Sequence, residues 1–114
     1  MFDFEQLHSY KRAKEFNSLV RKVLNCTAED NFSKNQLRRA AFSVILNLAE
    51  GTGRTTKADK KNFYVIARSS IFECVAIIDF WKDENLISNE EYSRLYLYAE
   101  EISKMLYAMI KALK

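Results

Sequence analysis

Apolar side chains recur along the chain every three or four positions, in four stretches separated by polar segments. This spacing puts them on one side of a helix with about 3.6 residues per turn. The four stretches predict helices over residues 4–26, 34–50, 57–84 and 89–112. Because the connecting segments are short, we expect consecutive helices to run antiparallel. The predicted fold is therefore all-α, an antiparallel up-down-up-down four-helix bundle.

Residues suited to capping a helix stand at the start of each predicted helix. The four candidates are Asp3, Ser33, Thr56 and Ser88. Each is followed three positions later by a side chain that accepts hydrogen bonds, which is the capping-box spacing. Gly51 stands where a left-handed residue would end the second helix. With no proline and only two glycines, the chain favours long helices, and its 114 residues are expected to form a single domain over 1–114.

The third helix illustrates how we expect the core to form. Its predicted core face consists of Phe63, Ile66, Ala67, Ser70, Cys74, Ile77, Ile78 and Trp81. Further apolar side chains on the second and third helices point away from the expected core. Such a patch is unusual on a small monomer, so we expect it to be covered by self-association, unless both neighbours bury a central second helix. The residues predicted to form a subunit interface are Phe42, Leu46, Val65 and Phe72.

A narrow polar strip runs along the second helix between two apolar sides. A helix that is apolar almost all round is normally buried, so we expect these polar side chains to lie where water is scarce. Buried polar groups destabilise the fold unless they are paired, so the strip is either a hydrogen-bond network or a binding site. Glu73 is the carboxylate expected to pair with Arg39 or Arg54. The predicted structural polar network comprises Arg39, Ser43, Asn47, Glu50, Arg54 and Glu73.

Positive charge is concentrated in the first part of the chain. The net charge is +3, and residues 1–70 hold 13 Lys and Arg against 7 Asp and Glu. A basic surface attracts nucleic acid, although the ordinary solvated surface of a bundle explains the charge as well. Cations at non-core positions are the candidate phosphate-binding residues. They are Lys11, Arg12, Lys14, Lys34, Arg38, Lys57, Lys60 and Lys61.

Cysteine and histidine are too sparse to indicate a metal site. Cys26 and Cys74 stand far apart in the sequence, and His8 is the one histidine. We expect both cysteines to be reduced core residues, with no metal and no cofactor. The N-terminus lacks the apolar run of a signal peptide, and no stretch approaches the ~18 apolar residues of a membrane span. These features predict a cytoplasmic protein without a membrane partner.

The stretch from Leu37 to Arg54, LRRAAFSVILNLAEGTGR, resembles the four helix bundle protein family, also called the 23S rRNA intervening-sequence protein family. The resemblance continues after the second helix and covers essentially the whole chain. Positions that match the family motif are Arg39, Ser43, Asn47, Ala49, Glu50, Gly51, Arg54, Phe63, Ala67, Ser69, Ser70 and Glu73. Members usually have proline where Leu46 stands, so we expect a straighter second helix here.

The resemblance implies a small bacterial bundle that often forms a ring-shaped homopentamer. The chain is similar, more distantly, to the pentameric accessory protein of diversity-generating retroelements, which works with a reverse transcriptase and nucleic acid. These similarities imply a homo-oligomer, whereas RNA or DNA is expected as a partner from the distribution of charge. Another protein remains the alternative partner.

The residues bear on three classes of function: an enzyme, a nucleic-acid-binding oligomer and a protein-interaction scaffold. Catalysis is not expected, because no histidine accompanies the serines and because arginines would neutralise Glu50 and Glu73, which makes them poor bases. A nucleic-acid-binding oligomer fits the charge, since phosphate contacts add when a basic surface is repeated. Without a base-reading motif, such binding would have low sequence specificity. A protein-interaction scaffold fits the same charges and is the alternative.

Overall fold

The computed structural model describes residues 1–27 and 31–113 and contains, among these residues, helices and no strand. The elements are a short 3-10 helix η1 (Asp3–Gln6) and the four helices α1 (His8–Cys26), α2 (Asn31–Thr52), α3 (Lys57–Asp83) and α4 (Asn89–Lys111). The prediction of an all-α fold is confirmed.

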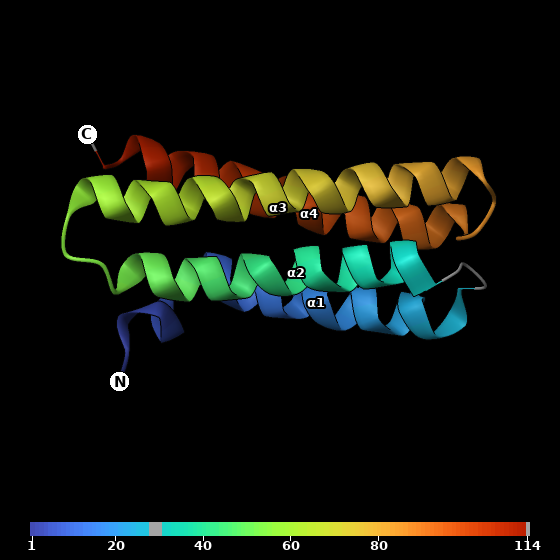
Figure 1. Cartoon of the computed structure of the whole chain (residues 1–114), viewed down its shortest axis with the longest axis horizontal. Coiled ribbons are helices and arrows are strands. Elements are labelled where there is room, and N and C mark those ends of the chain that lie inside the picture. The colour runs from blue at the N-terminus through green and yellow to red at the C-terminus, as the bar shows by residue number, and fades with distance from the viewer. Residues whose placement is uncertain (28–30, 114) are drawn as a thin grey trace.

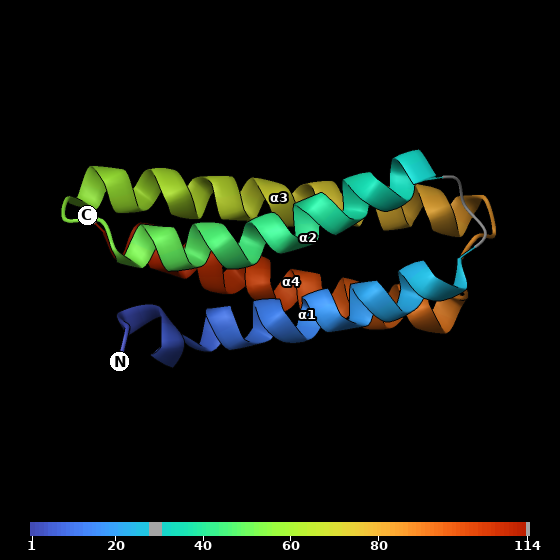
Figure 2. The same ribbon diagram turned by 60° about the horizontal axis from the view of Figure 1, so that its bottom comes forward.

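The four long helices lie side by side along a molecule about 44 Å long, and consecutive helices run in opposite directions (Figure 1). Each packs against two neighbours, α1 against α2 and α4, and α3 against α2 and α4, as the turned view also shows (Figure 2). Contacts between α2 and α3 confirm the antiparallel order: Ser33 bonds Trp81, and Ser43 bonds Ser70. The later residue of α2 therefore bonds the earlier residue of α3, which means that the two helices run in opposite directions.

Two of the four predicted caps are confirmed. The Thr56 hydroxyl accepts a hydrogen bond from the Asp59 amide at 3.1 Å, and the Ser88 hydroxyl accepts one from the Glu91 amide at 3.0 Å. The other two predictions are wrong. Asp3 belongs to η1, and α1 begins only at His8.

Ser33 is the fourth predicted cap, and it lies inside α2 because that helix begins two residues earlier, at Asn31. Its hydroxyl instead accepts a hydrogen bond at 3.2 Å from the indole nitrogen of Trp81. Helix α2 then runs unbroken through Leu46 to Thr52, two residues beyond its predicted end.

The core face of α3 differs in part from the prediction. Its buried residues are Tyr64, Ala67, Ser70, Ile71, Cys74, Ile78 and Trp81. Most of them alternate at steps of three and four, which is the seam of a left-handed bundle. Phe63 and Ile66 fall beside this seam, so Phe63 is half-buried and Ile66 is exposed. Ile77 is half-buried as well.

Gly51 does not end α2 in a left-handed conformation, because no glycine of the described residues has a positive φ. It lies inside the helix and is buried against α3. A β-carbon at this position would come within 2.6 Å of Cε1 of Tyr64 and 3.1 Å of Cβ of Phe63. The hydrogen of glycine thus allows α2 and α3 to approach closely at this end of the bundle.

We predict that Gly51→Ala destabilises the protein although alanine is the better helix former. Overpacking against the buried Tyr64 ring is expected to lower the free energy of unfolding by about 1–3 kcal/mol. Urea unfolding followed by circular dichroism measures this. Gly53→Ala is the matched control, since its β-carbon would meet nothing closer than 3.6 Å, and it should be neutral or slightly stabilising. Equal behaviour of the two variants would contradict the close approach.

Candidate nucleic-acid interface

The polar strip of α2 lies along its boundary with α3. The hydroxyl oxygens of Ser43 and Ser70 are 2.9 Å apart, so one donates to the other. The Asn47 amide donates to both the carbonyl and the hydroxyl oxygen of Ser43, each at 2.9 Å. These uncharged side chains form a partly buried network that joins the two helices. Ser70, expected on the core face, supplies the partner on α3.

The charged members of the strip are exposed, so the prediction that they are buried is wrong for the single chain. Nη2 of Arg54 lies 2.7 Å from Oε2 of Glu50, and its guanidinium carbon lies 4.5 Å from the centre of the Phe63 ring. Glu73 therefore is not the partner of Arg54. Because α2 has only two neighbours among the long helices, the outer flank of the strip stays in solvent.

Arg39 and Glu73 face the same shallow hollow between α2 and α3, together with Gln36, Ser43 and Ser70. Neither forms an ion pair with a described residue. The predicted Arg39–Glu73 pair is therefore not formed, and both charged side chains face solvent at the rim of the hollow. The six predicted network residues thus divide into a helix-joining part, an exposed ion pair and two solvated charges.

Two of the predicted phosphate-binding cations form contacts with another helix. Nη1 of Arg12 lies 2.7 Å from Oε2 of Glu15, and Nε lies 3.1 Å from Oε1 of Glu101, so Arg12 ties α1 to α4. The hydrogen bond to Glu15, together with the charge of Glu101, raises the pKa of Arg12. Nζ of Lys60 donates at 2.9 Å to the carbonyl oxygen of Thr52, at the end of α2.

The remaining predicted cations fall on two sides of the bundle. One group lies on the surfaces of α1 and α2, and we call it the α1–α2 basic surface: Lys11, Lys14, Lys34 and Arg38. Arg21, which the prediction omitted, is exposed and follows Lys14 by seven residues, so it extends this surface.

The second group begins with Lys57 and Lys61 on α3. Lys61 precedes Arg68 by two helical turns and therefore shares its side of the helix, which faces α4. Three further cations complete the α3–α4 basic surface: Arg68, Lys104 and Lys111. The prediction missed Lys104 and Lys111 because they lie outside the basic residues 1–70, and only the packing of α4 on α3 brings them to the same side as Lys61.

The four predicted interface residues also divide between two sides. Phe42 and Leu46 lie on the outer surface of α2, with 51% and 50% of their surface exposed. Val65 and Phe72 are exposed too, but they line a groove between α3 and α4. The structure therefore does not gather the four side chains into one surface.

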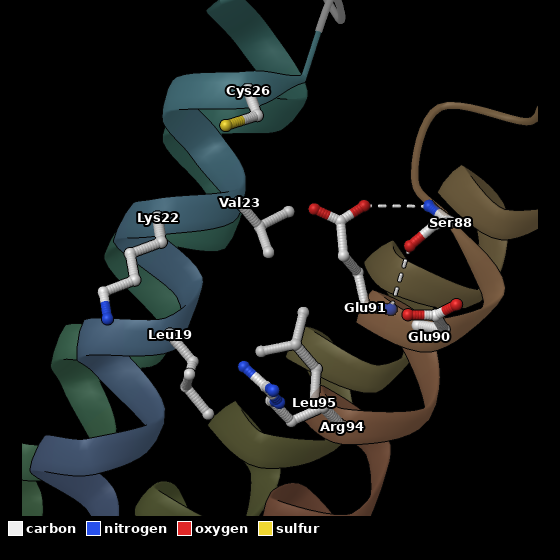
Figure 3. Close-up of a pocket in the computed structure, with 9 residues that line it drawn as sticks. All are labelled: Leu19, Lys22, Val23, Cys26, Ser88, Glu90, Glu91, Arg94 and Leu95. Carbon is white, nitrogen blue, oxygen red and sulfur yellow. Dashed lines mark hydrogen bonds between the residues drawn. The ribbon is translucent and has the colours of Figure 1, made fainter.

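A further hollow of about 320 Å³ lies between the end of α1 and the start of α4 (Figure 3). Lys22 of α1 and Arg94 of α4 line it from opposite helices, together with the apolar side chains of Leu19 and Leu95. Glu90 and Glu91 line it too, so it carries charges of both signs and offers no clear preference for an anion.

The two cysteines differ in exposure. Cys26 lines this hollow and is exposed, which corrects the expectation of a core thiol. Cys74 is buried as expected, and burial raises the pKa of its thiol to about 12. The described residues contain no cluster of His, Cys, Asp and Glu that could hold a metal ion. None of their helices is long and apolar enough to cross a membrane.

Fold and surface together define a small antiparallel helical bundle with basic outer surfaces. The model of the 23S rRNA-intervening sequence protein family matches residues 5–108, and the chain belongs to this family. A similar solved structure is a protein of unknown function from the S23 ribosomal protein family of Bacteroides thetaiotaomicron VPI-5482. It is 21% identical, with a TM-score of 0.86 over 90% of this chain and 98% of that chain. No curated protein matches the sequence significantly.

We predict that the two parts of the polar strip contribute differently to stability. Arg54→Gln removes an exposed ion pair and a cation–π interaction, and it should cost about 1 kcal/mol or less. Ser70→Ala removes the hydroxyl on α3 that is hydrogen-bonded to the partly buried Ser43 hydroxyl, and it should cost about 1–3 kcal/mol. Urea unfolding of each variant measures both. A loss of roughly 3–5 kcal/mol for Arg54→Gln would instead show that the charged pair is buried.

Proposed function

We propose that this protein is a non-enzymatic homo-oligomer that binds RNA or DNA electrostatically, with low sequence specificity. The observation that supports binding most directly is the state of its surface cations. Lys11, Lys34, Arg38 and Lys61 form no ion pair with any described residue. Cations that are not neutralised by neighbouring carboxylates can bind phosphates and release counterions.

The low specificity follows from the shape of these surfaces. The α1–α2 basic surface lies on the sides of packed helices, and base edges are read by elements that enter a groove of the duplex. Contacts to phosphates alone carry no sequence information. The family is named after an intervening sequence of 23S rRNA, which makes structured RNA the first ligand to test.

The proposed self-association rests on the outer surface of α2. Phe42 and Leu46 are one turn apart there, and Ile66 of α3 is exposed as well. Adjacent large apolar side chains in solvent are typical of a binding surface. The resemblance makes a pentamer the first expectation. Copies of the basic surfaces carried by one assembly would bind a long polyanion more tightly than one chain.

We predict that Lys11→Gln combined with Arg38→Gln weakens binding about equally for unrelated RNA and DNA sequences. The slope of log affinity against log salt should fall by roughly one unit for each phosphate that is no longer neutralised. Shift assays across a salt series measure both effects. Lys82→Gln combined with Arg94→Gln is the control, because it removes the same charge from positions outside the two basic surfaces. A protein that binds neither RNA nor DNA at low salt would favour the protein-interaction scaffold.

We predict that Phe42→Glu or Leu46→Glu dissociates the assembly, because either change places a charge in an apolar interface. Sedimentation velocity at micromolar concentration should show the unaltered protein as an oligomer and the variants as monomers. Ser18→Glu adds the same charge to an exposed position of α1 and should leave the oligomer intact. A monomeric unaltered protein would contradict the proposal.

A further inference from the structure

The groove between α3 and α4 combines cations with exposed aromatic rings. It consists of two hollows of about 220 Å³ and 320 Å³ that share Arg68 and Phe72. Val65 and Ile110 help to line the first, and Tyr96 and Lys104 help to line the second. The larger hollow is at the lower end of the about 300–1,000 Å³ found for ligand sites.

Arg68 is held in this groove by the backbone and by two rings. Its Nε donates to the carbonyl oxygen of Ser103 at 3.2 Å. The guanidinium carbon lies 4.9 Å from the centre of the Phe72 ring and 5.3 Å from that of Tyr107, within the range of a cation–π interaction. No described residue accepts a hydrogen bond from either terminal amino group. These groups therefore form an oriented fork that suits a phosphate.

The surroundings of Arg68 are positive and aromatic. Nζ of Lys111 lies 5.4 Å from the centre of the Tyr107 ring, and Lys104 lines the larger hollow. Glu100 is the one carboxylate among the described residues that line the two hollows. Both residues are accessible, with 56% of the Phe72 surface and 50% of the Tyr107 surface exposed.

We infer that the α3–α4 groove binds single-stranded nucleic acid, with unpaired bases stacked on the rings of Phe72 and Tyr107 and a phosphate on Arg68. Aromatic rings interleaved with cations are the arrangement by which proteins hold single strands. A duplex keeps its bases stacked inside and would meet only the cations. The inference rests on the proposed nucleic-acid binding and adds that this groove selects unpaired strands.

The charge of the groove favours this occupant over a second copy of the chain. A second copy that covered the rings would have to place carboxylates opposite Arg68, Lys104 and Lys111, or else bury unpaired charge. A polyanion with planar bases satisfies the cations and the rings together. The test therefore measures the oligomeric state of each variant as well as its affinity for nucleic acid.

The test replaces Phe72 and Tyr107 by leucine, singly and together, in the full chain. Binding is measured to a uridine-rich unstructured RNA and to a fully paired duplex with the same number of phosphates. We expect each change to weaken single-strand binding about tenfold and to leave duplex affinity unchanged. Phe80→Leu removes an exposed ring of α3 outside the groove and should change neither affinity.

Each other outcome overturns the inference in a distinct way. Equal losses of affinity for single strand and duplex, or no loss for either, would leave the proposed electrostatic binding intact and remove the stacking groove. Altered sedimentation of the leucine variants would assign the groove to a subunit interface. An unaltered protein that binds no nucleic acid would remove the proposed function as well.

Photocrosslinking of the unaltered protein provides a second measurement that does not depend on the variants. An RNA that contains 4-thiouridine should attach to the peptides that carry Phe72 and Tyr107. Attachment confined to peptides of α1 and α2 would overturn the inference, even if the variants fold poorly.

Discussion

The close packing of α2 on α3 is the constraint on which the rest of the structure depends. Gly51 lets the helices approach at one end, and the hydroxyl pair of Ser43 and Ser70 holds them near the middle. Small groups at a helix interface leave little freedom in register, because each fits only one opposing position. With this side of α3 turned toward α2, Arg68 and Phe72 lie beside α4.

Much of the fold could be predicted from the sequence, because long helices have strong local signals. The apolar period indicated the four helices, and Thr56 and Ser88 marked two of their starts correctly. The exact core face of α3 was harder to predict from the sequence. Ile66 is the more apolar of the pair Tyr64 and Ile66, yet the packing of α3 between two neighbours buries the tyrosine and leaves the isoleucine exposed.

The candidate site was predicted less well, since it depends on contacts between helices. Lys11 and Arg12 both stand within about one turn of Glu15, yet Glu15 and Glu101 of α4 pair with Arg12 alone. The cations of α4 were overlooked for the same reason, because charge was counted along the chain and not around the bundle. Gly51 was interpreted as a helix end because a local sequence pattern does not show that Tyr64 of α3 packs against it.

The chain contains one tryptophan, and its position gives the molecule a natural reporter. Trp81 is fully buried, and its indole nitrogen bonds Ser33 near the end of the α2–α3 interface that lies farthest from Gly51. Its emission should therefore change when these two helices separate and stay constant when a ligand occupies an outer surface. Intrinsic fluorescence can thus separate opening of the bundle from binding to its exterior.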